Sequence, residues 1–403
     1  SDAARVQPGA LNEALMDDGQ HGPLSVDVTT LARALANPAK VLLTERFGLR
    51  LQDEQITLSE REALQLDSLQ RWQLRDESLQ LVLAGQGPEA ADFLARRWRA
   101  EGTLPIGPAA VAAVQAQVQT VTTMMAAALE AIYGVDGAVG PAVDRAVEAA
   151  MGAAPLRLGA PLTRVASLHD DELGTWGVVL DDAIVVPDPK RPNATLLLVP
   201  TAGSLSLKRA LTAWLAMLVT ATAEPVGSFS GALLISKGKN KKNPAELTWF
   251  STPVDAEQQL RTLLRLWRRC QREPVPLFEK TSWALAAALA DQEDDATWFE
   301  LDAAARMALR VTAMTAWSSG FQRFGDDTDR WITAVWGEPD FDAALPDWPS
   351  ERPDAADDTP PAEPPWIQVV RQVLVPIVAG TCAFDTRPEP APHGDEAVSR
   401  GAR

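Results

Sequence analysis

The chain has 403 residues, with 37 Lys and Arg against 54 Asp and Glu and a formal net charge of -17. This acidic balance excludes a protein that coats nucleic acid or an anionic membrane by bulk charge, although it leaves room for a local basic contact. Hydrophobic residues make up 46% of the sequence, enough for a sizeable core, and no apolar stretch approaches the roughly 20 residues that span a bilayer. The two cysteines, Cys270 and Cys382, form neither a metal motif nor a disulfide framework, so we expect a reducing, cytoplasmic location.

The first third of the chain is patterned as helices. Residues 1–25 are punctuated by Gly and Pro and predict a flexible lead-in. From Val26 onward, apolar residues recur at intervals of three and four, as in Val114, Val118 and Val121. This spacing is typical of helices that bury one face, so the sequence predicts an N-terminal helical layer.

The period then changes from helix to strand. Residues 162–168, 176–180 and 183–186 predict a meander, and the apolar run 195–199 predicts a strand buried on both faces. A helix with apolar residues from Leu207 to Leu218 follows, with Ser204 as its predicted N-cap. Two more strands are predicted at 228–235 and 246–250. The fold class is therefore α/β, with a mixed β-sheet flanked by helices.

The last part of the chain divides by composition. Residues 276–336 are patterned mostly as helix, which extends the α/β domain over 26–336. Residues 337–365 are acidic and rich in Pro and predict a disordered loop. An amphipathic helix is expected at 366–380, docking back onto the domain, and 381–403 is expected to be a disordered tail.

Three parts of the chain resemble one known family. The first is the helix pair in 31–51, broken at Asn37-Pro38, and the second combines Leu-Gln-Arg-Trp-Gln-Leu at 69–74 with Gly-Thr-Leu-Pro-Ile-Gly at 102–107. The third is the order of strands and helix between Trp176 and Leu218. Together they resemble the C-terminal part of the RecC family, the gamma subunit of exodeoxyribonuclease V, over roughly 26–378 of this chain.

The resemblance implies a fold and a role. The C-terminal region of this family resembles the restriction-endonuclease-like PD-(D/E)XK nuclease core but has lost its catalytic groups. It implies a non-catalytic DNA-processing subunit of a helicase-nuclease that acts in double-strand break repair and recombination. The implied partners are subunits of the RecB and RecD types and DNA, forked or single-stranded, with no cofactor and no membrane contact.

Active nucleases of this fold need acidic groups at two strand ends. A carboxylate from one strand, and an acid and a lysine two residues apart from the next, hold Mg²⁺ and orient the attacking water. Here the first strand carries Val178, and the second runs into Pro200 and Thr201. We therefore expect no catalytic residue.

A rearranged nuclease site is the alternative. It would combine Asp181 or Asp182, at the end of the first strand, with Lys208, one turn into the following helix. This set still lacks a second acid. The simpler interpretation is that these three residues lie in a turn or on the surface and have no catalytic role.

Two polar clusters remain. The run His169-Asp170-Asp171-Glu172 is the densest group of possible metal ligands, but acidic turns are usually solvated, so we expect no metal site. The loop with Lys237, Lys239, Lys241 and Lys242 has two interpretations, phosphate contacts on DNA or a solubilising hairpin tip, and the second is the simpler. A module that binds only other proteins is a further alternative for the whole chain.

Overall fold

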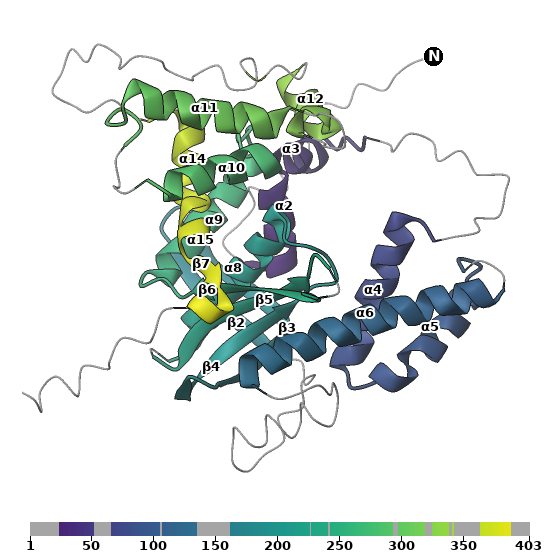
Figure 1. Ribbon diagram of the computed structural model, residues 1–403. Coiled ribbons are helices and arrows are strands. Elements are labelled where there is room, and N and C mark those ends of the chain that lie inside the picture. Colours follow the sequence, from purple (N-terminus) through teal and green to yellow (C-terminus); the bar gives the residue numbers. More distant parts are fainter. Residues whose placement is uncertain are drawn as a thin grey trace, which may run out of the picture.

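The fold is a mixed β-sheet with helices packed on both faces (Figure 1). The computed structural model describes residues 24–51, 66–104, 107–134, 162–225, 227–240, 242–292, 297–318, 325–337, 341 and 363–387. Within these residues the sheet has seven strands. The predicted α/β class, with a mixed sheet flanked by helices, is confirmed.

Most strands of the sheet lie beside the strand that precedes or follows them in the sequence, and β1, which lies beside β3, is the exception. They are β1 (Leu24–Asp27), β2 (Leu162–Asp170), β3 (Gly174–Asp188), β4 (Arg191–Pro200), β5 (Phe229–Lys237), β6 (Ala245–Ser251) and β7 (Thr381–Ala383). The order across the sheet is β1-β3-β4-β5-β6-β7, with β2 paired to β3. The meander β2–β3–β4 is antiparallel, whereas β4 and β5 are parallel. A parallel pair needs a crossover, and a helix between the two strands supplies it.

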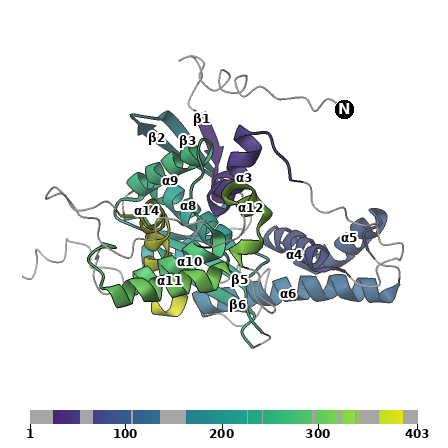
Figure 2. The ribbon, with the colours of Figure 1, turned by 90° about the horizontal axis from the view of Figure 1, so that it is seen from above.

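The longer helices fall into two groups in space (Figure 1). On one face lie α2 (Val28–Ala36), α3 (Pro38–Val41), α8 (Leu207–Ala223), α9 (Ala256–Cys270), α10 (Glu279–Ala290), α11 (Ala303–Trp317), α12 (Arg330–Trp336), α14 (Pro365–Val373) and α15 (Val375–Ala379). A helical arm consists of α4 (Ser68–Leu83), α5 (Gly87–Ala100) and α6 (Pro108–Tyr133). The inner part of α6 crosses the other face of the sheet, and α5 lies at the outer end of the arm (Figure 2). Short helical turns complete the chain at η1 (Leu42–Arg46), η2 (Asp326–Thr328) and η3 (Phe384–Thr386).

Alternation along β4 divides the core in two. Leu197 packs into the cluster that contains α8, α2 and α9, whereas Leu196 and Leu198 pack into the cluster with α6. Because successive strand side chains point to opposite faces, the apolar run at this strand fills both cores. Helix α8 is buried nearly all round, with Leu211 and Trp214 at 0% and 2% exposure. It is therefore the central helix of the domain.

One long strand replaces the two short ones that were predicted at 176–180 and 183–186. β3 runs through both, and its first half pairs with β1 and β2 while its second half pairs with β4. Asp182 has a φ of 55°, the one positive φ among the described non-glycine residues. The β2 register shifts beside it, between Leu162 and Arg164. The polar pair at 181–182 thus marks a bend in one strand and not a turn between two.

The start of α8 also differs from the prediction. The helix begins at Leu207 with Ser206 as its N-cap, and no side chain makes a capping hydrogen bond. The prediction of Ser204 was wrong because the loop after β4 follows β5 further than expected. The amide of Thr201 donates to the carbonyl of Ile235, and the amide of Lys237 donates to the carbonyl of Gly203. These bonds hold residues 201–203 against β5, so the helix begins only at Leu207.

The C-terminal segment adds the last strand at one edge of the sheet. After α14 and α15, β7 pairs with the edge strand β6, within the range 381–403 where a tail was expected. The lead-in before Leu24, the loop at 338–340 and 342–362, and the chain after Arg387 lie outside the described residues. Among the helices that are described, none is long and apolar enough to cross a membrane.

Candidate nucleic-acid interface at the end of β4

The carboxyl end of β4 and the first turn of α8 form the candidate site. The loop between them lies against the start of the β5–β6 hairpin, since Thr201 N donates to Ile235 O over 2.8 Å and Lys237 N donates to Gly203 O over 3.0 Å. The strand end, the start of α8 and the basic hairpin are therefore neighbours. This is the edge of the sheet where the acid and lysine of a nuclease were sought.

The positions at which the nuclease acids were sought carry no carboxylate; they are Val178, Pro200 and Thr201. Val178 in β3 is fully buried at 0% exposure and packs in the core with α8. Pro200 and Thr201 are half-buried at the end of β4. An aliphatic side chain and a proline ring offer no ligand to Mg²⁺, which prefers carboxylate and carbonyl oxygens.

The residues of the rearranged site lie on different elements. Asp181 and Asp182 are exposed on β3, and the hydroxyl of Thr163 donates to Asp181 Oδ1 over 3.1 Å. Lys208 is exposed on the first turn of α8. Its pKa is lowered by burial and then by neighbouring cations, and the one carboxylate among the largest influences on it is Glu279 from α10. The acid with an electrostatic influence on Lys208 thus comes from a helix that the sequence hypothesis did not consider.

Arg209 is the most closely held cation at the site. Its Nη1 donates to the carbonyl oxygen of Ser204 over 2.5 Å. The guanidinium lies over Gly203 so closely that a Cβ there would come within 2.2 Å of Nη2. Burial lowers the pKa of this half-buried guanidinium. Glycine at 203 is therefore required for the arginine to fold back over its own loop.

Two acids near Arg209 come from distant helices. Asp76 of α4 and Glu279 of α10 both act on the Arg209 guanidinium. Burial raises the pKa of each carboxyl group above its usual range. Their negative charge is thus disfavoured relative to that of an acid in water.

Asp326, which also influences Glu279 electrostatically, has a structural role at the start of α10. Its Oδ2 accepts hydrogen bonds from the backbone amide and the hydroxyl of Thr281, each over 2.7 Å, and from the amide of Lys280 over 3.1 Å. It therefore satisfies the free amides at the start of α10.

The basic hairpin connects β5 and β6. Lys237 is half-buried, Lys239 and Lys242 are exposed, and Lys241 lies outside the described residues. Asn240 Oδ1 accepts from the amides of Lys242 and of Asn243, which fixes the turn. The described lysines of this loop form no ion pair, so their charges face solvent beside the β4–α8 loop.

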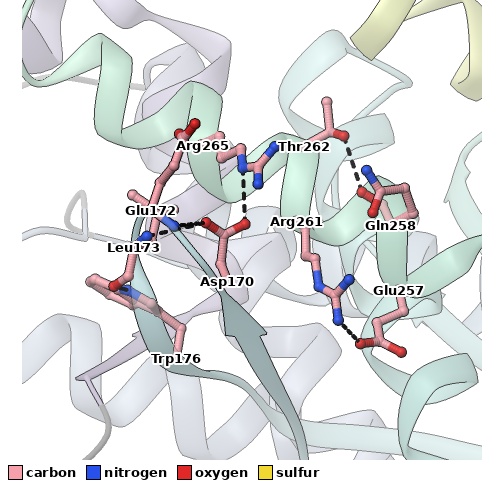
Figure 3. Close-up of polar contacts among 9 residues, drawn as sticks. All are labelled: Asp170, Glu172, Leu173, Trp176, Glu257, Gln258, Arg261, Thr262 and Arg265. Atoms are coloured by element: carbon pink, nitrogen blue, oxygen red, sulfur yellow. Dashed lines mark hydrogen bonds and ion pairs between the residues drawn. The ribbon is translucent and has the colours of Figure 1, made fainter.

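The acidic turn at 169–172 is held by structural contacts (Figure 3). Asp170 Oδ1 accepts from the amides of Glu172 and Leu173, and its Oδ2 accepts from Arg265 Nε over 2.9 Å. Burial alone would raise the pKa of Asp170, but these hydrogen bonds lower it below the usual value. Over the part of the chain that the structure describes, no group of three or more His, Cys, Asp or Glu side chains is placed to hold a metal ion.

Sequence reasoning missed most of the charged groups at this site. Arg33 of α2, Arg75 of α4 and Glu279 of α10 all act on Lys208 or Arg209. They lie between 71 and 175 positions from Lys208 along the chain, as the residue numbers give. The local signal was the pair Lys208-Arg209 at a helix start, where a cation is disfavoured by the helix dipole.

The fold is thus an α/β domain with a mixed sheet, and the loop and helix that follow β4 carry Thr201, Lys208 and Arg209. The description of the matching family model is "RecC C-terminal domain", and the match covers residues 23–290. The chain therefore belongs to the RecC C-terminal domain family, and the resemblance drawn from its motifs is confirmed.

Two curated relatives share part of this sequence. The RecBCD enzyme subunit RecC from Mycobacterium tuberculosis strain CDC 1551 / Oshkosh is 31% identical over 137 residues, which are 34% of this chain and 11% of the relative. The protein of the same name from strain ATCC 25618 / H37Rv gives the same values. The aligned stretch thus spans about a tenth of the length of each relative.

Proposed function

We propose that this chain is a non-catalytic DNA-processing part of a RecBCD-type helicase-nuclease, exodeoxyribonuclease V. It acts in double-strand break repair and recombination in the cytoplasm, by contacting subunits of the RecB and RecD types and DNA at the fork. Membership of the RecC C-terminal domain family supports this role. The restriction-endonuclease-like PD-(D/E)XK core belongs to the same proposal, supported by the meander β2–β3–β4, the crossover α8 and the parallel strand β5.

One observation carries the non-catalytic part of the proposal. At the two positions where the nuclease acids were sought, this chain has Val178, buried within β3, and the sequence Pro200-Thr201 at the end of β4. Without carboxylates at these positions, the acidic ligands that hold Mg²⁺ in an active nuclease of this fold are missing from their usual places. The shape of a nuclease core is then available for guiding DNA instead of cutting it.

A cleavage assay tests this against the rearranged nuclease. The purified chain is incubated with single- and double-stranded DNA and Mg²⁺, beside the variants Asp182→Ala, Asp181→Ala and Lys208→Gln. We expect no Mg²⁺-dependent cleavage above the buffer control. Cleavage by the wild-type chain that disappears in Asp182→Ala and in Lys208→Gln contradicts the proposal and establishes the alternative site.

A binding assay tests the DNA contact. We propose that the loop lysines 237, 239, 241 and 242 contact phosphates, because their described members face solvent next to the β4–α8 loop. Replacing all four with Gln is expected to weaken salt-dependent binding to forked DNA. If the wild-type chain binds no DNA at any ionic strength but captures subunits of the RecB or RecD type, the alternative of a pure protein-interaction module is correct.

A further inference from the structure

Cations from four helices lie around the first turn of α8. We call this group the α8 cation cluster, and its members are Arg33 of α2, Lys40 of α3, Arg71 and Arg75 of α4, and Lys208 and Arg209 of α8. They act on one another: Arg33, Arg209 and Lys40 all influence Lys208, while Arg71 and Arg209 influence Arg75. One set of cations around Lys208 and another around Arg75 are therefore linked through Arg209, although the whole chain carries a net charge of -17.

Acidic partners are scarce around these cations. Within the residues that the structure describes, Arg33, Arg75 and Lys208 form no ion pair with a carboxylate. Arg75 Nε is buried without a hydrogen-bond partner in the same part of the chain. Lys40 lies over the ring of Trp331, with Nζ 5.3 Å from the ring centroid, and Arg209 donates to the carbonyl of Ser204.

The acids in the neighbourhood do not neutralise the cluster. Asp76 and Glu279 each have an electrostatic influence on Arg209. Neither forms an ion pair with a cluster member among the described residues. Behind Glu279, Asp326 is used by the amides of α10, and Asp329 accepts from the side chain of Asn37. Lys280 adds a further positive charge beside Glu279.

Concentrated positive charge without partners is unfavourable unless an anion joins it. Arg75 and Arg209 are half-buried, whereas the other four members of the cluster are exposed. Repulsion between the two half-buried guanidinium groups is screened less than repulsion among exposed cations, so a bound anion would stabilise this pair most. Arginine also matches the geometry of a phosphate better than lysine does, because its planar fork donates two parallel hydrogen bonds. The cluster lies at the carboxyl end of β4, the edge at which active nucleases place a metal ion next to the DNA backbone.

We propose that the α8 cation cluster binds a backbone phosphate of a DNA strand, so that Lys208, Arg209 and their neighbours replace the positive charge of the missing metal. This proposal rests on the proposed function, since it assumes that DNA reaches this edge of the sheet. The amide of Lys237 bonds to Gly203, so the basic hairpin begins on the same loop over which Arg209 folds. The cluster and the hairpin thus offer two phosphate contacts on either side of the β4–α8 loop.

A matched pair of variants tests the proposal. The full chain is titrated with a labelled single-stranded oligonucleotide and with forked DNA at several salt concentrations between about 50 and 200 mM. The test variant is Lys208→Gln with Arg209→Gln. The control is Arg96→Gln with Arg99→Gln, which makes the same charge change at exposed positions of α5, at the outer end of the arm (Figure 2).

The proposal predicts a specific change in the salt dependence. Each lost phosphate contact lowers the slope of log K against log salt by about 0.7 for a single strand, so the test variant loses about 0.7 to 1.4 and the control loses less than about 0.3. Binding is expected to be unchanged when Mg²⁺ is replaced by a chelator. The single variant Lys208→Gln, at an exposed position, shows the effect even if loss of Arg209 disturbs the loop.

Each other outcome overturns a defined statement. If the wild-type chain binds DNA and both double variants lose the same slope, the α8 cation cluster is not a phosphate site, while the proposed DNA role stands. If inorganic pyrophosphate raises the Tm of the wild-type chain but not of the test variant, and DNA affinity is equal in both, the cluster binds free anions only. If the wild-type chain binds no DNA, the proposed function fails and this proposal fails with it.

Discussion

Arg387 and Asp188, 199 residues apart in sequence, form a buried ion pair in which Nη2 and Oδ1 are 2.8 Å apart. Their side chains are 3% and 2% exposed. The guanidinium also lies over the rings of Trp249 and Phe384, with Cζ 5.0 and 4.5 Å from the ring centroids. Arg387, which directly follows η3, thus connects the C-terminal part of the described chain to the end of β3 at Asp188.

Removing one partner of this pair should be strongly destabilising. The variant Arg387→Ala leaves the Asp188 carboxylate buried with only the amide of Lys190 as a described donor, and breaking a buried pair in this way costs about 3–5 kcal/mol. Chemical denaturation of the full chain measures the change. Replacing both partners with apolar residues, as in Arg387→Met with Asp188→Leu, is expected to recover much of the loss.

A change below about 1 kcal/mol in Arg387→Ala would contradict this account, since exposed ion pairs contribute that little. The exposed residue Arg99 provides the control. Arg99→Ala is expected to leave the free energy of unfolding within about 0.5 kcal/mol of the wild-type value.

The bond between Asp170 and Arg265 predicts a pH dependence of stability. Asp170 is buried and its carboxylate accepts three hydrogen bonds (Figure 3), and hydrogen bonds to a charged group each contribute about 1.5–3 kcal/mol. Because Arg265 is 45% exposed, solvent screens its share. We therefore expect Asp170→Asn to be clearly more destabilising at pH 7 than Arg265→Ala.

The sign of the pH effect follows from the direction of the pKa shift. The pKa of Asp170 is lowered in the folded chain below its ordinary value of 3.8. Its contribution is present above pH 3.8 and is lost as the pH falls through the folded-state pKa. The difference in Tm between the wild-type chain and Asp170→Asn should therefore be constant from pH 7 to about 5 and shrink below 3.8, and a constant difference down to pH 3 would contradict the assignment.

Elements with a local pattern could be predicted from the sequence. The spacing of Leu211, Trp214 and Leu218 predicted α8, because a helix that packs one face repeats apolar residues every three or four positions. The run at 195–199 predicted β4, because a strand buried on both faces is apolar without interruption. The strands β1 and β7 could not be predicted from a pattern. β1 has four residues and β7 has three. Each forms because a strand that is distant in the sequence provides its hydrogen bonds.

The same reason limits what the sequence says about the site. It predicted Val178, Pro200 and Thr201 to be degenerate catalytic positions, which stays a prediction, and it placed Lys208 on the first turn of a helix, as the structure has it. It did not connect Lys208 with Arg33 or Arg75, because no local pattern records which helices meet at the end of β4. The start of α8 was also misplaced, since the bonds from residues 201–203 to β5 are long-range information.

Gly231 in β5 is expected to tolerate no side chain. Its φ is +150°, and a Cβ would come within 2.4 Å of the carbonyl oxygen of Phe250 and 2.6 Å of Trp249 Cζ2. Gly231→Ala should destabilise the chain by about 1–3 kcal/mol, because the sheet must shift to relieve the clash. Gly102→Ala is the comparison, since Gly102 has a φ of +69° but no atom within 4 Å of the Cβ that alanine would add; equal effects of the two variants on the free energy of unfolding would exclude a steric cause.

Asp76 gives a pH effect of the opposite sign. Burial raises its folded-state pKa above the ordinary value of 3.8, and the Arg209 guanidinium offsets this only in part. A group with a raised pKa contributes stability below pH 3.8 that is lost as the pH rises through the folded-state value. Asp76→Asn, which carries no charge at any pH, should therefore raise the Tm slightly at pH 7, and the gain should vanish as the pH falls to about 3.8.

The same variant provides a second, independent measurement. Removing the Asp76 charge leaves the α8 cation cluster more positive, so Asp76→Asn is expected to bind single-stranded DNA more tightly at low salt. Thermal unfolding between pH 7 and 4 and a DNA titration measure the two effects. A lower Tm at pH 7 would mean that Asp76 stabilises Arg209 as a charged partner, and a weaker DNA affinity would mean that it positions that arginine for the phosphate.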